Sequence, residues 1–251
     1  FLFFQFPSYV DSLAFYNKLY LRYTLQHQLN PFIVDAYFQK VNAERGRGDW
    51  IALIKTGQEA LNKIDSLKIA VSAHQKSLII DEMVYGYIFL SDIENAVLYT
   101  QQSIKSLKKE NHNGENNLQI SLMCLTAARA FGYANNYLTS GRYLDSSLVY
   151  INQTNDILQK HYILNDWVSN KIDLKKHAEA LPMAYQCLRF FEKNANNRGL
   201  TEIQMLIGRL LLGLKKYDES IVFSKKNIKK INRYINNKNH RKKENEKQQL
   251  Q

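Results

Sequence analysis

A short pattern occurs five times along this chain and limits how it can fold: a polar turn followed by a helix with an apolar stripe. The copies, of which "GDWIALIKTGQEAL" is the first, begin at Gly48, Ser91, Gly141, Lys175 and Lys215. Two residues after each start comes a larger side chain, at Trp50, Ile93, Tyr143, His177 and Tyr217. Long repeats of this kind predict an array of similar structural units.

Small side chains recur at fixed distances after the bulky one. Three residues on, Leu53 is the exception and the others are small: Ala96, Ser146, Ala180 and Ser220. Seven residues further come Ala60, Ser103, Gln153, Cys187 and Asn227. These sites share one helix face, and small residues there let two helix backbones approach. Apolar residues at helical spacing also precede each turn, so each unit is predicted to be helix, turn, helix.

This pattern resembles the tetratricopeptide repeat (TPR) over roughly residues 32 to 234. The last unit, "IGRLLLGLKKYDESI", has Gly208 and Ser220 where that family uses small residues in its two helices. The bulky turn residues lie 43, 50, 34 and 40 residues apart. Only one interval matches the family's period of about 34 residues. The extra length is expected to extend helices.

The resemblance implies an all-α fold, a right-handed α-α superhelix of about five antiparallel helix pairs with a leading helix. Composition agrees, because 10 Gly and 3 Pro leave few breaks and no alternating run predicts a strand. We expect the repeat domain to span residues 15–234. Residues 1–14 are open to two interpretations, a signal-peptide remnant or a first helix. Asn30 with Pro31 predicts a helix start, and Pro182 is acceptable if its helix begins near Ala180.

The positive charge gathers at the C-terminal end. From Lys225 onward the net charge is +8, while residues 1–224 carry +3. We therefore expect no direct nucleic-acid binding by this body, and membrane contact only through flanking segments. Residues 235–251 have a basic, polar composition typical of a disordered or fraying tail.

No catalytic or metal-binding motif is found, so we predict neither an enzyme nor a cofactor. Paired metal ligands, nucleophile motifs and glycine-rich phosphate loops are absent from the sequence. Asp81 and Glu82 are adjacent, and neighbouring helical residues point in different directions. Cys124 and Cys187 are far apart and flanked by apolar residues, which favours two buried thiols.

What remains is a binding surface for a protein or peptide. The resemblance implies that the first helix of each pair lines an inner face. The residues expected on that face are Asp81, Tyr85, Asn135, Asn165, Ser169 and Arg209. Aromatic, amide and Arg groups suit an extended peptide.

Three contexts for such a module remain open. One is the sensing or interaction part of a bacterial signalling or transcriptional regulator, periplasmic or membrane-tethered if the N-terminus is a signal remnant. The alternative is a stand-alone cytoplasmic scaffold or co-chaperone-like adaptor. The third is an enzyme regulator of the peptide-pheromone receptor kind, which also uses a helical-repeat array.

Overall fold

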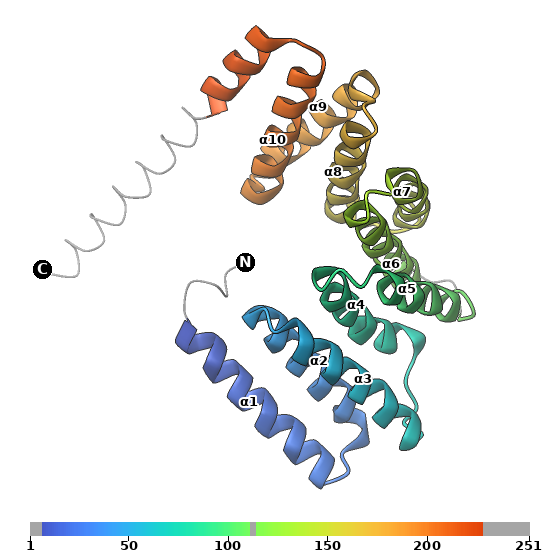
Figure 1. Cartoon of the computed structure of the whole chain (residues 1–251). Helices are drawn as coiled ribbons and strands as arrows, with labels where there is room; N and C mark the ends of the chain where they lie inside the picture. Colours follow the sequence, from blue (N-terminus) through green and yellow to red (C-terminus); the bar gives the residue numbers. More distant parts are fainter. Residues whose placement is uncertain (1–6, 111–113, 228–251) are drawn as a thin grey trace, which may run out of the picture. The chain divides into compact units, whose positions relative to one another are not determined.

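The computed structural model describes residues 7–110 and 114–227, and the described chain is helical without any strand (Figure 1). The helices are α1 (Pro7–Gln26), α2 (Asn30–Arg47), α3 (Trp50–Ser66), α4 (Ala73–Phe89), α5 (Ile93–Leu107), α6 (Gly114–Tyr133), α7 (Tyr137–Ile151), α8 (Ile157–Asp173), α9 (His177–Lys193) and α10 (Asn197–Gly213). A further helical segment covers 217–227. The predicted leading helix and five helix pairs are thus confirmed. The basic tail at 235–251 lies outside the described residues.

The chain divides into two compact units, Phe1–Ile163 and Leu164–Gln251, so that α8 begins in the first unit and ends in the second. In the first unit each helix packs on the next one along the chain, from α1 to α7. Two further contacts skip a helix, since α2 touches α4 and α4 touches α6. Helices α2, α4 and α6 therefore form one layer of this unit, and α3, α5 and α7 lie on its other side.

The turn within each helix pair has one recurring geometry. The residue two positions before the second helix adopts a left-handed conformation, at Gly48, Ser91, Asn135, Lys175 and Lys215. The next residue donates its backbone N–H back into the preceding helix, as Asp49 does to the Glu44 carbonyl at 3.0 Å. Asp49, Asp92 and Asn136 then cap the following helix with their side chains. This is the helix-ending motif in which a left-handed residue satisfies the last carbonyls, followed at once by an N-cap.

The bulky residue predicted to close the turn is the first residue of the second helix. This holds for Trp50, Ile93, His177 and Tyr217. In the third unit the prediction was wrong by six residues, because α7 begins at Tyr137 and Tyr143 lies inside it. With Tyr137 in place of Tyr143, the first residues of the second helices lie 43, 44, 40 and 40 residues apart, so the unit is uniformly longer than about 34 residues.

Burial confirms the corrected register of α7. Ser140 and Ser147 are buried, whereas Ser146 and Gln153, the small sites expected from the sequence, are exposed. In the other units Ala96 and Ala180 are fully buried, as the pattern predicted. The smaller side chains in α5, α7 and α9 thus lie where two helices of a pair touch.

Glycine supports the same close approach between α3 and α4. A Cβ atom added to Gly86 would lie 2.8 Å from the Ile54 side chain and 3.2 Å from the Trp50 carbonyl oxygen. Because backbone cannot move aside cheaply, only glycine fits at this crossing. The stacked rings of Trp50 and Phe89, 4.1 Å apart, cover the end of the same interface.

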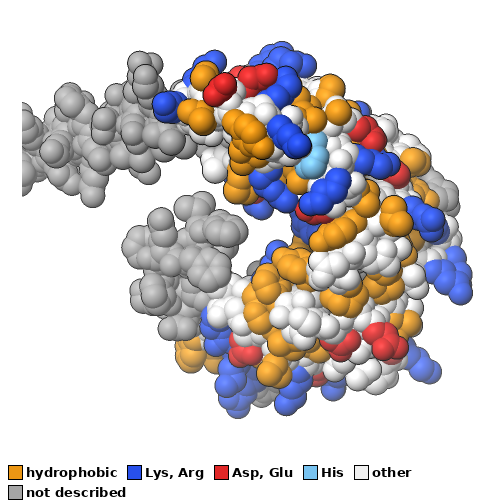
Figure 2. Space-filling model, turned by 45° about the horizontal axis from the view of Figure 1, so that its top comes forward, with side chains coloured by type: hydrophobic (Ala, Val, Ile, Leu, Met, Phe, Trp, Pro, Cys, Tyr) orange, Lys and Arg blue, Asp and Glu red, His pale blue; other side chains and the backbone are white. Residues whose placement is uncertain are grey.

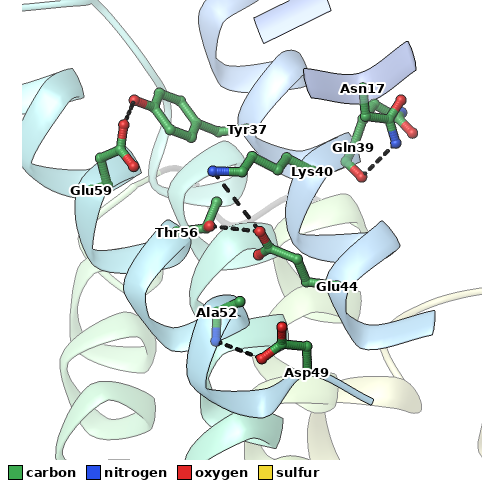
Figure 3. Close-up of polar contacts among 9 residues, drawn as sticks. All are labelled: Asn17, Tyr37, Gln39, Lys40, Glu44, Asp49, Ala52, Thr56 and Glu59. Atoms are coloured by element: carbon green, nitrogen blue, oxygen red, sulfur yellow. Dashed lines mark hydrogen bonds and ion pairs between the residues drawn. The ribbon is translucent and has the colours of Figure 1, made fainter. Parts of the chain in front are cut away.

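Polar contacts join α2 and α3 within their pair (Figure 3). Thr56 Oγ1 donates to Glu44 Oε1 at 2.9 Å, and Tyr37 OH donates to Glu59 at 2.9 Å. Glu44 is buried, and desolvation raises the pKa of its carboxyl group. These bonds satisfy polar groups at an otherwise apolar interface, so they help to set which residues of the two helices face each other.

Two details of the helix starts differ from the sequence prediction. Asn30 is the first residue of α2 rather than its cap, which is Leu29 and makes no side-chain hydrogen bond. A helix start near Ala180 was expected, which would place Pro182 in the first turn. Helix α9 instead begins at His177, three residues earlier, so Pro182 lies inside the helix. Proline there removes one backbone hydrogen bond, a cost that the packing of α9 must offset.

Within the described ranges, no helix combines the length and the apolar character that crossing a membrane requires. Both cysteines are free and buried, as predicted from their apolar neighbours.

Candidate ligand-binding face

The first helices of the pairs carry two series of equivalent positions, counted back from the first residue of the following helix. Eight residues before it lie Asn42, Tyr85, Arg129, Ser169 and Arg209. Twelve residues before it lie Phe38, Asp81, Leu125, Asn165 and Met205. Five of the six residues predicted from the sequence belong to these two series.

Tyr85 of α4 is the centre of a polar network in the first unit. The guanidinium carbon of Arg45, from α2, lies 4.2 Å from the centre of the Tyr85 ring. Arg129 of α6 donates from Nη1 to the Tyr85 hydroxyl at 2.6 Å. One aromatic side chain thus lies between two cations from the neighbouring helices of the layer. Burial raises the pKa of Tyr85, so its hydroxyl stays neutral and accepts the bond from Arg129.

Acidic groups on α4 balance this charge. Arg45 Nη1 lies 2.7 Å from both carboxylate oxygens of Glu82, a residue that is itself buried. Asp81 accepts a hydrogen bond from Thr126 Oγ1 of α6 at 2.7 Å. Burial, with a contribution from Glu82, raises the pKa of Asp81 to about 6. The two acids that looked independent in the sequence do point to different neighbours, Glu82 to α2 and Asp81 to α6.

Asn135 is not on the helix face where it was expected. It is the left-handed residue of the turn between α6 and α7, it is exposed, and its side chain accepts a bond from Tyr137 OH at 2.7 Å. The misplacement has the same cause as that of Tyr143, since both lie six residues too late. The residue at the equivalent position is Arg129, and the Asn135–Asn136 turn is the signal that would have found it.

The second unit holds the other three predicted residues. Asn165 is buried, and among the described residues neither atom of its side-chain amide has a hydrogen-bond partner. Ser169 is partly buried one turn further along α8. Arg209 of α10 is exposed and pairs with Asp173 of α8 at 3.1 Å. A buried amide without a partner is costly.

The solved structures most informative for this fold are helical-repeat proteins. BtubC (BKLC) from P. vanneervenii aligns with a TM-score of 0.72 and 10% identity, over 86% of this chain and 89% of that chain. The TPR-like repeats of a putative kinesin light chain from Podosopora anserina align with a TM-score of 0.63 and 11% identity, over 78% and 93%. This chain has the TPR-like repeat fold.

A third TPR-like neighbour was solved with a ligand. It is a Rap protein complexed with competence and sporulation factor, with a TM-score of 0.55 and 9% identity, over 86% of this chain and 75% of that chain. No family model and no curated protein matches the sequence. Sequence identities this low show a shared fold and nothing more. The ligand of this TPR-like chain must therefore be argued from its own residues.

Neither a metal-binding cluster nor an activated thiol occurs among the described residues of this TPR-like array. No group of three or more His, Cys, Asp or Glu side chains in the described residues is arranged to hold a metal ion. Burial raises the pKa of Cys124 to about 11 and that of Cys187 to about 12, so both thiols are neutral near pH 7 and poor nucleophiles. On the face drawn in Figure 2, apolar side chains alternate with Lys and Arg. Such a mixed surface suits contacts to another polypeptide.

Proposed function

We propose that this TPR-like chain is a protein- or peptide-binding module whose α2, α4 and α6 layer contacts the ligand. The observation that carries the proposal is the placement of Tyr85 between Arg45 and Arg129. Tyrosine and arginine are the residue types that most often dominate binding energy at protein interfaces. Here the network holds Arg45 against the Tyr85 ring and Arg129 against its hydroxyl before any ligand arrives, which lowers the entropy that binding must overcome.

The polar groups of the network match an extended polypeptide. The Arg45 guanidinium has more donors than its bonds to Glu82 use, and it can meet backbone carbonyls or a carboxylate. Asp81 can accept from a backbone N–H. The Rap protein complexed with competence and sporulation factor supports the proposal as an example of this fold holding a ligand.

We further infer a context, the sensing or interaction part of a bacterial signalling or transcriptional regulator. The alternative is a stand-alone cytoplasmic scaffold or co-chaperone-like adaptor. Sequencing the complete open reading frame separates them. A downstream membrane span followed by DNA-binding helices favours the sensor, and a frame that holds the array alone favours the adaptor.

A peptide-display selection tests the binding role. Random peptides are selected on the purified chain, and the Kd of an enriched peptide is measured by calorimetry. We expect the double variant Tyr85→Ala, Arg129→Ala to raise that Kd at least tenfold while circular dichroism stays helical. Arg142→Ala, on exposed α7 surface, is the matched control and should change the Kd less than twofold.

Removing residues 235–251 distinguishes binding by the α2, α4 and α6 layer from binding by the positive charge of the tail. If the layer carries the affinity, the truncated chain binds the same peptide with nearly unchanged Kd. If truncation abolishes binding and the full chain loses affinity steeply with salt, the ligand is instead a polyanion or an acidic membrane surface held by the tail. That outcome would overturn the proposal.

A further inference from the structure

A hollow lies on the other side of the first unit, between α5 and α7. It has a volume of about 480 Å³, and its wall and floor include Lys105, Lys108, Lys109, Cys124, Tyr143 and Tyr150. The lysines come from the end of α5 and the residues that follow it, the tyrosines from α7, and the cysteine from α6. A volume of this size is within the roughly 300–1,000 Å³ of ligand sites. It is separate from the Tyr85 network on α2, α4 and α6.

The charge of this hollow is uncompensated. Some other lysines of the described chain pair with acids, for example Lys76 with Asp65 at 2.7 Å and Lys171 with Glu179 at 2.6 Å. None of the three lysines of the hollow pairs with a described carboxylate. The nearest described interaction is that of the Lys108 ammonium, 5.4 Å from the centre of the Tyr150 ring. The helix dipole makes the C-terminal end of α5 a favourable place for positive charge, but this effect alone does not require three lysines.

The opposite wall is aromatic and held in place. The Tyr143 ring stacks on Phe131 with centroids 5.5 Å apart, and its hydroxyl accepts a bond from Gln101 Nε2 at 3.0 Å. Cys124 is buried below it, and its raised pKa keeps the thiol neutral. The hollow therefore combines a cationic wall with a rigid aromatic wall and an apolar floor.

The spacing of these residues suits a segment of chain better than a single small anion. Tyr143 and Tyr150 are seven residues apart in α7, which corresponds to about 10 Å along the helix axis. An extended peptide rises about 3.3 Å per residue, so this wall spans about three residues. A lone phosphate or carboxylate would leave most of the wall uncovered.

We propose that the α5–α7 hollow binds a short acidic segment of a partner protein. Its carboxylates lie against Lys105, Lys108 and Lys109, and an aliphatic side chain between them packs on Tyr143, Tyr150 and Cys124. Charge complementarity selects the acidic segment and speeds the encounter, while the aromatic wall supplies the apolar contact. The site acts independently of the Tyr85 network, so the chain has two binding faces.

The probe is an N-acetylated, C-amidated peptide of sequence DELDEL carrying a fluorescent label, and its uncharged analogue is NQLNQL. Fluorescence anisotropy with the full chain gives both Kd values. We expect DELDEL to bind at least tenfold more tightly than NQLNQL, and the Tyr143 and Tyr150 ring signals to shift in NMR spectra. Absence of DELDEL binding, or equal binding of both peptides, overturns the proposal.

Two charge-reversal variants locate the site. Lys105→Glu, Lys108→Glu should weaken DELDEL binding at least tenfold. Lys18→Glu, Lys55→Glu changes the net charge equally at exposed positions of α1 and α3, and should weaken it less than threefold. If both pairs weaken binding equally, the attraction is general electrostatics and the hollow is not a site. The double variant Tyr85→Ala, Arg129→Ala should leave DELDEL binding unchanged, because these residues lie outside the hollow. The test of the hollow can therefore fail or succeed independently of the test of the proposed function.

Discussion

Ser121 of α6 and Ser147 of α7 bond to each other's backbone. Each hydroxyl lies 2.8 Å from the other residue's carbonyl oxygen, and the two hydroxyl oxygens are 3.0 Å apart. Both residues are fully buried. Such reciprocal contact requires two small side chains at the crossing, and it identifies Ser147 rather than Gln153 as the second small site of α7.

Replacing Ser147 by Leu tests this register. The larger side chain overpacks the crossing and leaves Ser121 without its partner, so we expect a loss of about 1–3 kcal/mol in the free energy of unfolding. Ser146→Leu, on the exposed side of α7, should cost less than about 0.5 kcal/mol. Urea unfolding of both variants gives the comparison. A larger cost at Ser146 would restore the alignment expected from the sequence.

The small sites of α5 and α9 lead to a parallel prediction. Ala96→Phe or Ala180→Phe should each cost about 1–3 kcal/mol, because both side chains are fully buried between packed helices. Lys225→Phe, in the exposed part of the last described helical segment, should cost much less. Equal tolerance at the three positions, measured by thermal or urea unfolding, would contradict the helix-pair packing.

Gly48 is the one glycine among the left-handed turn residues, with φ of 72°. A side chain is strained in that conformation, so Gly48→Ala should cost about 1 kcal/mol. Gly208→Ala is the control, since a Cβ there meets nothing within 4 Å and alanine favours the helix interior. We expect the control to raise the melting temperature and Gly48→Ala to lower it. Two changes of the same sign would be inconsistent with the turn geometry.

Asp81 predicts a dependence of stability on pH. Burial is the main cause that raises its pKa to about 6 from an ordinary value of 3.8. The folded state therefore holds the proton more tightly than the unfolded state. The protonated Asp81 carboxyl group therefore contributes to the free energy of unfolding fully below about pH 4, and this contribution is lost as the pH rises through 6.

Asp81→Asn removes this titration and keeps an oxygen for Thr126. The stability of the variant relative to wild type should improve by about 1–3 kcal/mol between pH 4 and pH 7. Chemical denaturation at a series of pH values measures the difference. A difference that stays constant over this range would show that Asp81 titrates as it does in the unfolded chain.

Much of this fold could be predicted from local sequence signals. Asp49, Asp92 and Asn136 cap helices with their own side chains, and each precedes a bulky residue and a helical apolar stripe. Capping, turn formation and helix periodicity act within a few residues, so a pattern of letters is enough to indicate them. The third unit misled the prediction because "SGRYLDSS" imitates the turn of its neighbours although it lies inside α7.

The all-helical class, the number of helix pairs, the burial of both cysteines and most of the equivalent positions on the first helices could be predicted from the residues alone. That Arg129 and not Asn135 reaches Tyr85, and that Glu82 pairs with Arg45, follows from the packing of separate helices. These contacts join residues 37 and 44 positions apart. Their geometry depends on how α2, α4 and α6 pack side by side, and no local preference encodes the register between separate helices.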